Sequence, residues 1–337
     1  MKKFFIYLFA FVLIGTFITV FSLTFADNLI YSINNSSIII ETSNSLQDIS
    51  TEGIKLESEV ESVQYAYNNK YYMYLKDNRI YIHDTKTKEV TDVIDDQNNI
   101  CFYNLLYDKN LIIYFTEKKV GSSSKLTIKT YEISSKSKME YNEFTVYNFS
   151  RIKELEASPV INVKYINIET KSGSKTNNII YRVDLFNSMA QVKSGIIIDK
   201  LVMLKQKDRL YYENDKGDIY YSGGKLNIFK EKVNLIGTDL NDNLYFISQD
   251  NKDKVYKVDN NKIIDTIQLS DTDAVTWYSD NTNVYLVYPT YIINVSSEQP
   301  HKRLIRLSNY VTFESIKTDT VYLRSKDNII VTRQLAE

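Results

Sequence analysis

Short stretches in which apolar and polar residues alternate recur about every 40 residues along most of the chain. In the clearest unit, residues 62–94, the pairs Asn68-Asn69 and Asp77-Asn78 separate the stretches SVQYAY, KYYMYLK and RIYIHD. Apolar side chains fall on both faces of KYYMYLK, which indicates a strand whose sheet is covered on both sides. Asn and Asp pairs between strands favour tight hairpins. We therefore predict that each unit is a small antiparallel sheet packed between two neighbours.

The same pattern returns in several later units. Three of them resemble the first in length and lie at residues 201–229, 233–269 and 274–307. Two longer units lie at residues 100–144 and 151–193 and carry polar inserts at 121–125 and 171–178. We expect both inserts to be solvated loops. The first strand of the second long unit has a short helix over residues 152–157 as its alternative.

The last unit holds only three strands, YVTFESIK, TVYLRS and NIIVTRQ. A fourth strand is available from GIKLES at residues 53–58, and a strand from the opposite end of the chain would remove an exposed sheet edge. The pattern predicts an all-β fold, a β-propeller of about seven four-stranded blades, with six or eight as alternatives, in residues 53–337. A pair of tandem β-sandwiches is the competing architecture.

An uncharged apolar run extends from residue 4 to residue 25, directly after Lys2 and Lys3. Its length suffices to cross a bilayer, so we predict a signal-anchor or transmembrane segment at residues 1–26 and a linker at 27–52. The two lysines place the bulk of the chain outside the cytoplasm. Cleavage of a signal peptide near Ala26, which would secrete the protein, and a buried core helix are the alternatives.

From residue 53 onward the chain resembles the broad bacterial class of β-propellers with WD40-like or quinoprotein-like repeats. The resemblance lies in the repeated strands and Asp/Asn turns quoted above, because no Trp-Asp signature, Kelch double glycine or quinoprotein tryptophan motif recurs. It implies the fold and carries no family function. The abundance of Tyr (28 residues), Ile, Asn and Lys is typical of an AT-rich bacterial genome.

Charge and cysteine content exclude several classes of function. The chain has 41 Lys and Arg against 42 Asp and Glu, so neither sign dominates and the basic excess typical of nucleic-acid binding is absent. Its single cysteine, Cys101, cannot form an internal disulfide and lies in the apolar stretch ICFY, where we expect a buried strand position.

No group of residues points to a metal or a cofactor. The two histidines, His83 and His301, belong to different units, and we expect both at the surface; without a Cys/His cluster, zinc is excluded. Residues 239–243 (DLNDN), with Asp250, resemble the first half of a calcium loop, but the required glycine is missing. We predict hairpin turns there and at 214–218.

The expected innermost strands also argue against catalysis. The stretches SVQYAY, LVMLKQ, VNLIGT and AVTWYS contain no acidic residue, whereas glycoside hydrolysis needs a pair of carboxylates in a cleft. Trp277 is expected to pack between blades. The tyrosine pairs Tyr71-Tyr72, Tyr211-Tyr212 and Tyr220-Tyr221 place one ring on each face of a sheet. We predict no catalytic, cofactor-binding or metal-binding residues.

Together these features predict a membrane-anchored, extracytoplasmic β-propeller that acts as a non-enzymatic scaffold for a protein partner in a bacterial envelope complex. The alternative is a binding module for cell-wall glycan or peptide that uses its tyrosine-rich rim. A hydrolase or lyase is a third option, which would need clustered acids or histidines in the central channel.

Overall fold

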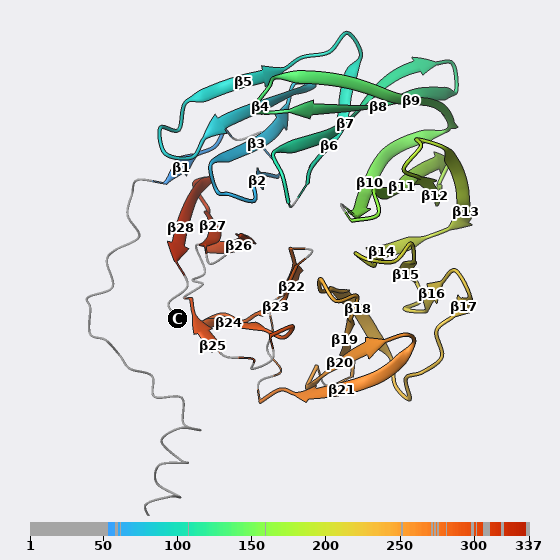
Figure 1. Cartoon of the computed structure of the whole chain (residues 1–337), viewed down its shortest axis with the longest axis vertical. Coiled ribbons are helices and arrows are strands. Elements are labelled where there is room, and N and C mark those ends of the chain that lie inside the picture. Colours follow the sequence, from blue (N-terminus) through green and yellow to red (C-terminus); the bar gives the residue numbers. More distant parts are fainter. Residues whose placement is uncertain are drawn as a thin grey trace, which may run out of the picture. The chain divides into compact units, whose positions relative to one another are not determined.

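The computed structural model of the chain describes residues 53–334, apart from 58–59, 61, 107, 159, 251, 271, 273, 275, 281, 298–299, 301, 306–310 and 318–319. The described residues form seven four-stranded antiparallel sheets, which follow one another around a ring (Figure 1). The predicted β-propeller is therefore confirmed with seven blades, and the tandem sandwiches are wrong. The predicted membrane segment, 1–26, and linker, 27–52, lie outside the described residues. Within those residues, no helix has the length and apolar character needed to cross a bilayer.

Each blade is numbered in chain order and begins with its innermost strand. Blade 1 contains β2 (Gln64–Tyr65), β3 (Tyr71–Lys76), β4 (Arg79–Asp84) and β5 (Val90–Ile94), and blade 2 contains β6 (Asn99–Leu105), β7 (Leu111–Val120), β8 (Ser123–Glu132) and β9 (Ser137–Tyr147). Blade 3 contains β10 (Phe149–Ser158), β11 (Val163–Ser172), β12 (Lys175–Val183) and β13 (Met189–Ile196), and blade 4 contains β14 (Ile198–Met203), β15 (Leu210–Asn214), β16 (Ile219–Tyr221) and β17 (Gly224–Lys225). Blade 5 contains β18 (Val233–Thr238), β19 (Leu244–Ser248), β20 (Lys254–Asp259) and β21 (Lys262–Gln268), and blade 6 contains β22 (Thr276–Ser279), β23 (Val284–Val287), β24 (Tyr291–Asn294) and β25 (Lys302–Leu304). Blade 7 contains β26 (Val311–Lys317), β27 (Thr320–Ser325) and β28 (Ile329–Gln334), with β1 (Ile54–Lys55) as its outermost strand.

The ring closes through β1, as the incomplete last repeat predicted. Ile54 lies opposite Ile330 and Lys55 opposite Ile329 in an antiparallel ladder. Gly53 precedes this strand, and a Cβ atom there would lie only 2.6 Å from the carbonyl oxygen of Ile330. A glycine is therefore required where the two ends of the chain meet.

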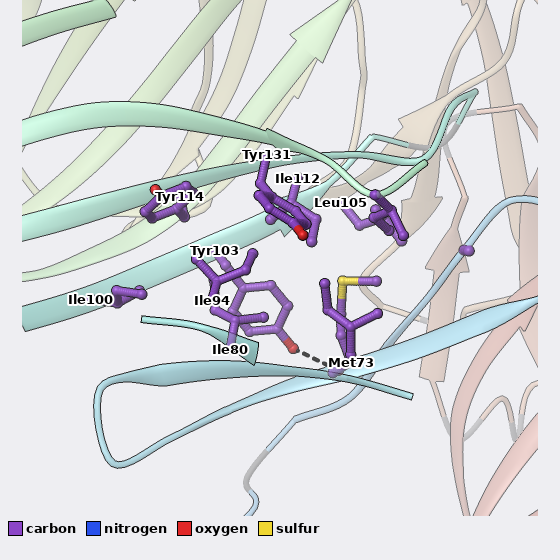
Figure 2. Packing of buried hydrophobic residues seen from close by; sticks show 12 residues of the cluster. Met73, Ile80, Ile94, Ile100, Tyr103, Leu105, Ile112, Tyr114 and Tyr131 are labelled. Atoms are coloured by element: carbon purple, nitrogen blue, oxygen red, sulfur yellow. Dashed lines mark hydrogen bonds between the residues drawn. The ribbon is translucent and has the colours of Figure 1, made fainter. Parts of the chain in front are cut away.

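The core is divided among the interfaces between neighbouring blades. Between blades 1 and 2, Met73 and Ile80 pack against Ile112 and Tyr103 (Figure 2). The hydroxyl of Tyr103 donates a hydrogen bond of 3.0 Å to the carbonyl of Met73, so the buried polar atom of this ring is satisfied. Apolar residues on both faces of each strand are needed because every blade has a neighbour on each side.

Blades 2 and 3 have the longest strands, and here one expectation is wrong. The polar inserts at 121–125 and 171–178 are not solvated loops: the hairpin strands run through them, turning at Gly121 (φ 61°) and Gly173 (φ 60°). Two-residue turns with left-handed glycines hold such hairpins without a loop. The predicted first strand of blade 3 is confirmed, because residues 152–157 belong to β10, and the alternative of a short helix there is wrong.

Candidate functional site

The innermost strands enclose a channel at the centre of the ring. Two cavities of about 270 and 170 Å³ lie along it and share Glu156, Tyr278 and Ser279 as lining residues. The charged side chains that line one or both cavities are Glu154, Glu156, Lys200, Asp280, Glu314 and Lys317. The channel is therefore polar, in contrast to the apolar interfaces between blades.

The acids in this channel were missed by the sequence analysis. The four stretches that it named as inner strands indeed lack acids, but β10 is also an inner strand and contributes Glu154 and Glu156. A shift in pairing between Ile152 and Glu154 interrupts the alternation of β10 and turns the two carboxylates toward the channel. Glu314 enters the channel from β26 in the same way, beside another such shift at residues 313–315.

Burial sets the electrostatics of these groups. Desolvation, with the nearby charge of Glu156 as a smaller cause, raises the pKa of Glu154 to about 8. Burial likewise lowers the pKa of Lys200, although the neighbouring carboxylates oppose this shift. Glu156 is paired with the ammonium group of Lys205 at 3.2 Å, and the side chain of Lys205 is fully buried. A buried charge of this kind depends on its partner.

Several polar side chains of the inner region accept a hydrogen bond from a backbone N–H group of the next blade. Glu154 of blade 3 accepts a hydrogen bond of 3.0 Å from the backbone N–H of Leu201 in blade 4. Two further bonds of this type link Gln64 to the N–H of Leu105 (2.7 Å) and Glu213 to the N–H of Leu235 (2.8 Å). The inner acceptors thus hold neighbouring blades together.

Two hydroxyl groups at the larger cavity lack a hydrogen-bond partner within the described part of the chain. They belong to Tyr65 and Ser315, whose side chains are buried. Lys317 lines the same cavity, and burial lowers its pKa. Unsatisfied hydroxyls beside a polar cavity suit water or a polar ligand.

His83 is not a surface residue, contrary to our expectation, and is 8% exposed. Its ring stacks on Tyr72 and Tyr74, and its Nε2 lies 3.2 Å from the Tyr74 hydroxyl. Desolvation lowers its pKa. His301 lies outside the described residues, and in the described part no three His, Cys, Asp or Glu side chains gather as metal ligands would.

The remaining candidates have structural roles. Trp277 packs against the core between blades 5 and 6, as predicted. It also lines the smaller of the two channel cavities. Cys101 is half-buried in β6, where burial raises the pKa of its thiol to about 12, which disfavours the nucleophilic thiolate form. Residues 239–243 form the predicted hairpin turn, in which the carboxylate of Asp239 accepts the N–H groups of Asn241 and Asn243. Asn214 organises the turn at 214–218 likewise.

A third cavity, of about 420 Å³, lies between blades 3 and 4, away from the channel, and we call it the tyrosine pocket. Its lining residues are Tyr165, Ile180, Val192, Lys193, Leu210, Tyr212, Tyr220, Tyr221, Ser222 and Gly224. The predicted division of the tyrosine pairs is confirmed: Tyr212 stacks on Tyr220, while Tyr211 stacks on Tyr221. The pocket itself was not predicted from the sequence, and it forms where the outer strands of blade 4 are short.

Comparison with known proteins shows the fold. No model of a known protein family matches the sequence, and no curated protein resembles it at the level of sequence. Among solved structures, the Myceliophteria thermophila Cps50 (Swd1) β-propeller domain is similar with a TM-score of 0.50 and 12% identity, over 84% of this chain and 98% of that one. A chain of the Mitotic Checkpoint Complex has a TM-score of 0.50 and 10% identity, over 85% of this chain and 93% of that one. Kluyveromyces lactis Hsv2 has a TM-score of 0.47 and 11% identity, over 82% of this chain and 98% of that one. At this level of identity the fold alone is shared. The chain folds as a seven-bladed β-propeller.

Proposed function

We propose that the protein is a membrane-anchored, extracytoplasmic scaffold that docks a protein partner in a bacterial envelope complex and catalyses no reaction itself. The uncharged run at residues 4–25 would anchor it, and Lys2 and Lys3 would orient the ring outside the cytoplasm. The fold is compatible with this role, since one solved neighbour belongs to an assembly, the Mitotic Checkpoint Complex.

The observation that carries the proposal is the uneven distribution of exposed apolar side chains. In the described part of the chain, most of the large exposed ones lie on blades 2 and 3 and their connections: Val120, Met139, Tyr141, Tyr147, Val160, Leu185, Phe186, Val192 and Ile197. Single apolar residues at a surface are ordinary, but a concentration on two adjacent blades is typical of a protein-binding face.

The channel supports the non-enzymatic part of the proposal. The carboxylate of Glu156 is occupied by Lys205, and that of Glu314 by Arg324, at 2.6 Å. Glu154 accepts the N–H of Leu201 across the blade interface. These three groups have structural partners, which supports a structural role for them.

Crosslinking in intact cells, followed by purification of the tagged protein and mass spectrometry, tests this function. We expect one envelope protein in near-stoichiometric amount. Recovery of wall fragments alone, with no protein, would contradict the proposal and favour a ligand-binding module.

A second candidate function, binding of a small wall glycan or peptide fragment in the channel, is favoured by the hydroxyls of Tyr65 and Ser315, which have no hydrogen-bond partner among the described residues. Calorimetric titration of the purified protein with soluble wall fragments tests it. Binding that Ser315→Ala weakens would support this function, and absence of heat at millimolar fragment would contradict it.

A further inference from the structure

The tyrosine pocket exists because the outer part of blade 4 is reduced. β16 has three residues and β17 has two, whereas the facing outer strand of blade 3, β13, has eight. The short strands leave the half-buried rings of Tyr212 and Tyr220 uncovered beside β13. A cavity of about 420 Å³ is within the range of pockets that bind ligands and side chains.

The floor of the pocket is apolar. Ile180 and Leu210 are buried there, and neither carries a polar side-chain atom. Tyr165 contributes its ring, because its hydroxyl already donates to Asp208 at 2.8 Å. This floor offers a sugar no free side-chain hydrogen-bonding group, whereas an apolar side chain that contacts it gains by leaving water, so the floor favours an apolar side chain.

Among the lining residues of the pocket, Lys193 alone carries a charge. Lys193 is exposed, and no ion pair forms between it and any described residue. Lys225, next to Gly224 at the mouth, is in contrast paired with Asp218 at 2.7 Å. Lys193 therefore supplies a positive charge that favours a carboxylate beside the occupant of the pocket.

The walls are well suited to act as a fixed receptor. Tyrosine rings lose little conformational freedom on binding, and Tyr212 and Tyr220 already hold each other at a centroid distance of 5.4 Å. The ring of Tyr221 folds over the turn at Gly223, where a Cβ atom would lie 2.4 Å from the ring. Val192, which is 52% exposed, continues the apolar surface outward along β13.

We propose that the tyrosine pocket binds an aromatic or branched aliphatic side chain of a partner polypeptide, and that an Asp or Glu next to that side chain pairs with Lys193. This inference rests on the proposed scaffold function and identifies its docking site. Aromatic-lined, desolvated pockets with a polar edge are where binding energy concentrates at protein interfaces.

The first experiment places a photoreactive benzoylphenylalanine at Val192 of the full chain in the native cell. A matched control carries it at Ile263, on the outer strand of blade 5, which is 39% exposed. We expect position 192 alone to crosslink to a protein, through a segment with a large apolar residue within two positions of an Asp or Glu. Crosslinks to glycan or lipid, or to a segment lacking these residues, would overturn the inference.

The second experiment measures binding of a synthetic peptide with the crosslinked sequence to the purified full chain. Lys193→Glu should weaken binding about tenfold or more, and replacing the acid of the peptide by Lys should restore it. Lys262→Glu, at an exposed position of blade 5, should bind as the unmodified chain does. Because Lys193 is exposed, the variant is expected to fold, and Tyr220→Ala gives an independent test of the apolar contact. Equal affinity of both pocket variants and the unmodified chain would overturn the inference.

The two proposals fail in different ways. If whole-cell crosslinking recovers a protein partner but position 192 captures none, the pocket inference is wrong and the scaffold function stands. If neither experiment recovers a protein, both are wrong.

Discussion

Blades 2 and 3 differ from blade 4 in how far their strands extend beyond the common core of the ring. The strands of blade 2 have 7 to 11 residues and those of blade 3 have 8 to 10, whereas blade 4 needs only 6, 5, 3 and 2. Both kinds of blade bury an apolar interface on each side. The extra length is therefore not required to close the ring, and together with the connections of these blades it supplies surface on which the exposed apolar side chains lie.

This difference in strand length separates the residues that stabilise the ring from the residues that shape its binding surface. Residues near the channel and between blades determine stability, so substitutions there should affect folding. Residues at the ends of the long strands and at the edge of the short blade determine what the surface can bind. The predictions below test this separation, from the largest expected effect to the smallest.

Removal of the closing strand should have the largest effect. A chain that lacks residues 1–52 should fold, whereas a chain that lacks residues 1–61 loses the buried side chains of Ile54, Leu56 and Val60. Burial of such side chains contributes about 1.5–3 kcal/mol each, so we expect a loss of roughly 5 kcal/mol in the free energy of unfolding. Thermal melting of the two truncated chains measures it. Equal melting temperatures would show that β1 does not close the ring.

The channel pair Glu156–Lys205 should matter more than a surface pair on a long blade. Glu156→Gln leaves a fully buried ammonium group without its carboxylate, which costs about 3 kcal/mol. Glu143→Gln breaks a pair with Lys125 on blade 2, in which both side chains are 45% exposed, and should cost under about 1 kcal/mol. Urea unfolding of the two variants gives the comparison.

A double variant controls for this interpretation. Replacing Glu156 by Leu and Lys205 by Met removes both charges and should recover most of the lost stability. Equal stability losses in Glu156→Gln and Glu143→Gln would mean that the channel carboxylates contribute no more than those of the surface.

Glu154 should give the ring a pH dependence that the surface acids lack. Its pKa is raised to about 8 by burial, so between the ordinary pKa of a glutamate and pH 8 the folded chain binds more protons than the unfolded chain. Stability from this group is present at low pH and is lost as the pH rises toward 8. Glu154→Gln should flatten the decline in melting temperature between pH 5 and about 8. If melting temperature declines with pH equally steeply in the variant, a group other than Glu154 causes the pH dependence.

The sequence predicted the parts of the molecule in which side-chain pattern and structure coincide. The alternation in KYYMYLK predicted the blades, because a sheet covered on both sides needs apolar residues on both faces. The three-strand final repeat predicted the closure by residues 53–58, because it leaves a sheet edge that needs a fourth strand.

The candidate sites could not be predicted from the pattern of apolar and polar residues. The pairing shift between Ile152 and Glu154 changes the phase of β10, so its carboxylates could not be assigned to the channel from alternation. The tyrosine pocket arises from the shortness of β16 and β17, which is a property of the fold and not of any one residue. His83 was misplaced because its burial depends on rings from the neighbouring strand.

The smallest effect on stability should come from the exposed side chains of the long blades. Phe186 is 86% exposed, so Phe186→Ser should change the free energy of unfolding by no more than about 0.5 kcal/mol. The same holds for Ile264→Ser on blade 5, where the side chain is 55% exposed. If blades 2 and 3 form the binding face, only Phe186→Ser should reduce the yield of the crosslinked partner. Equal yields from both variants, with stability unchanged, would mean that the long strands add surface without adding a binding face.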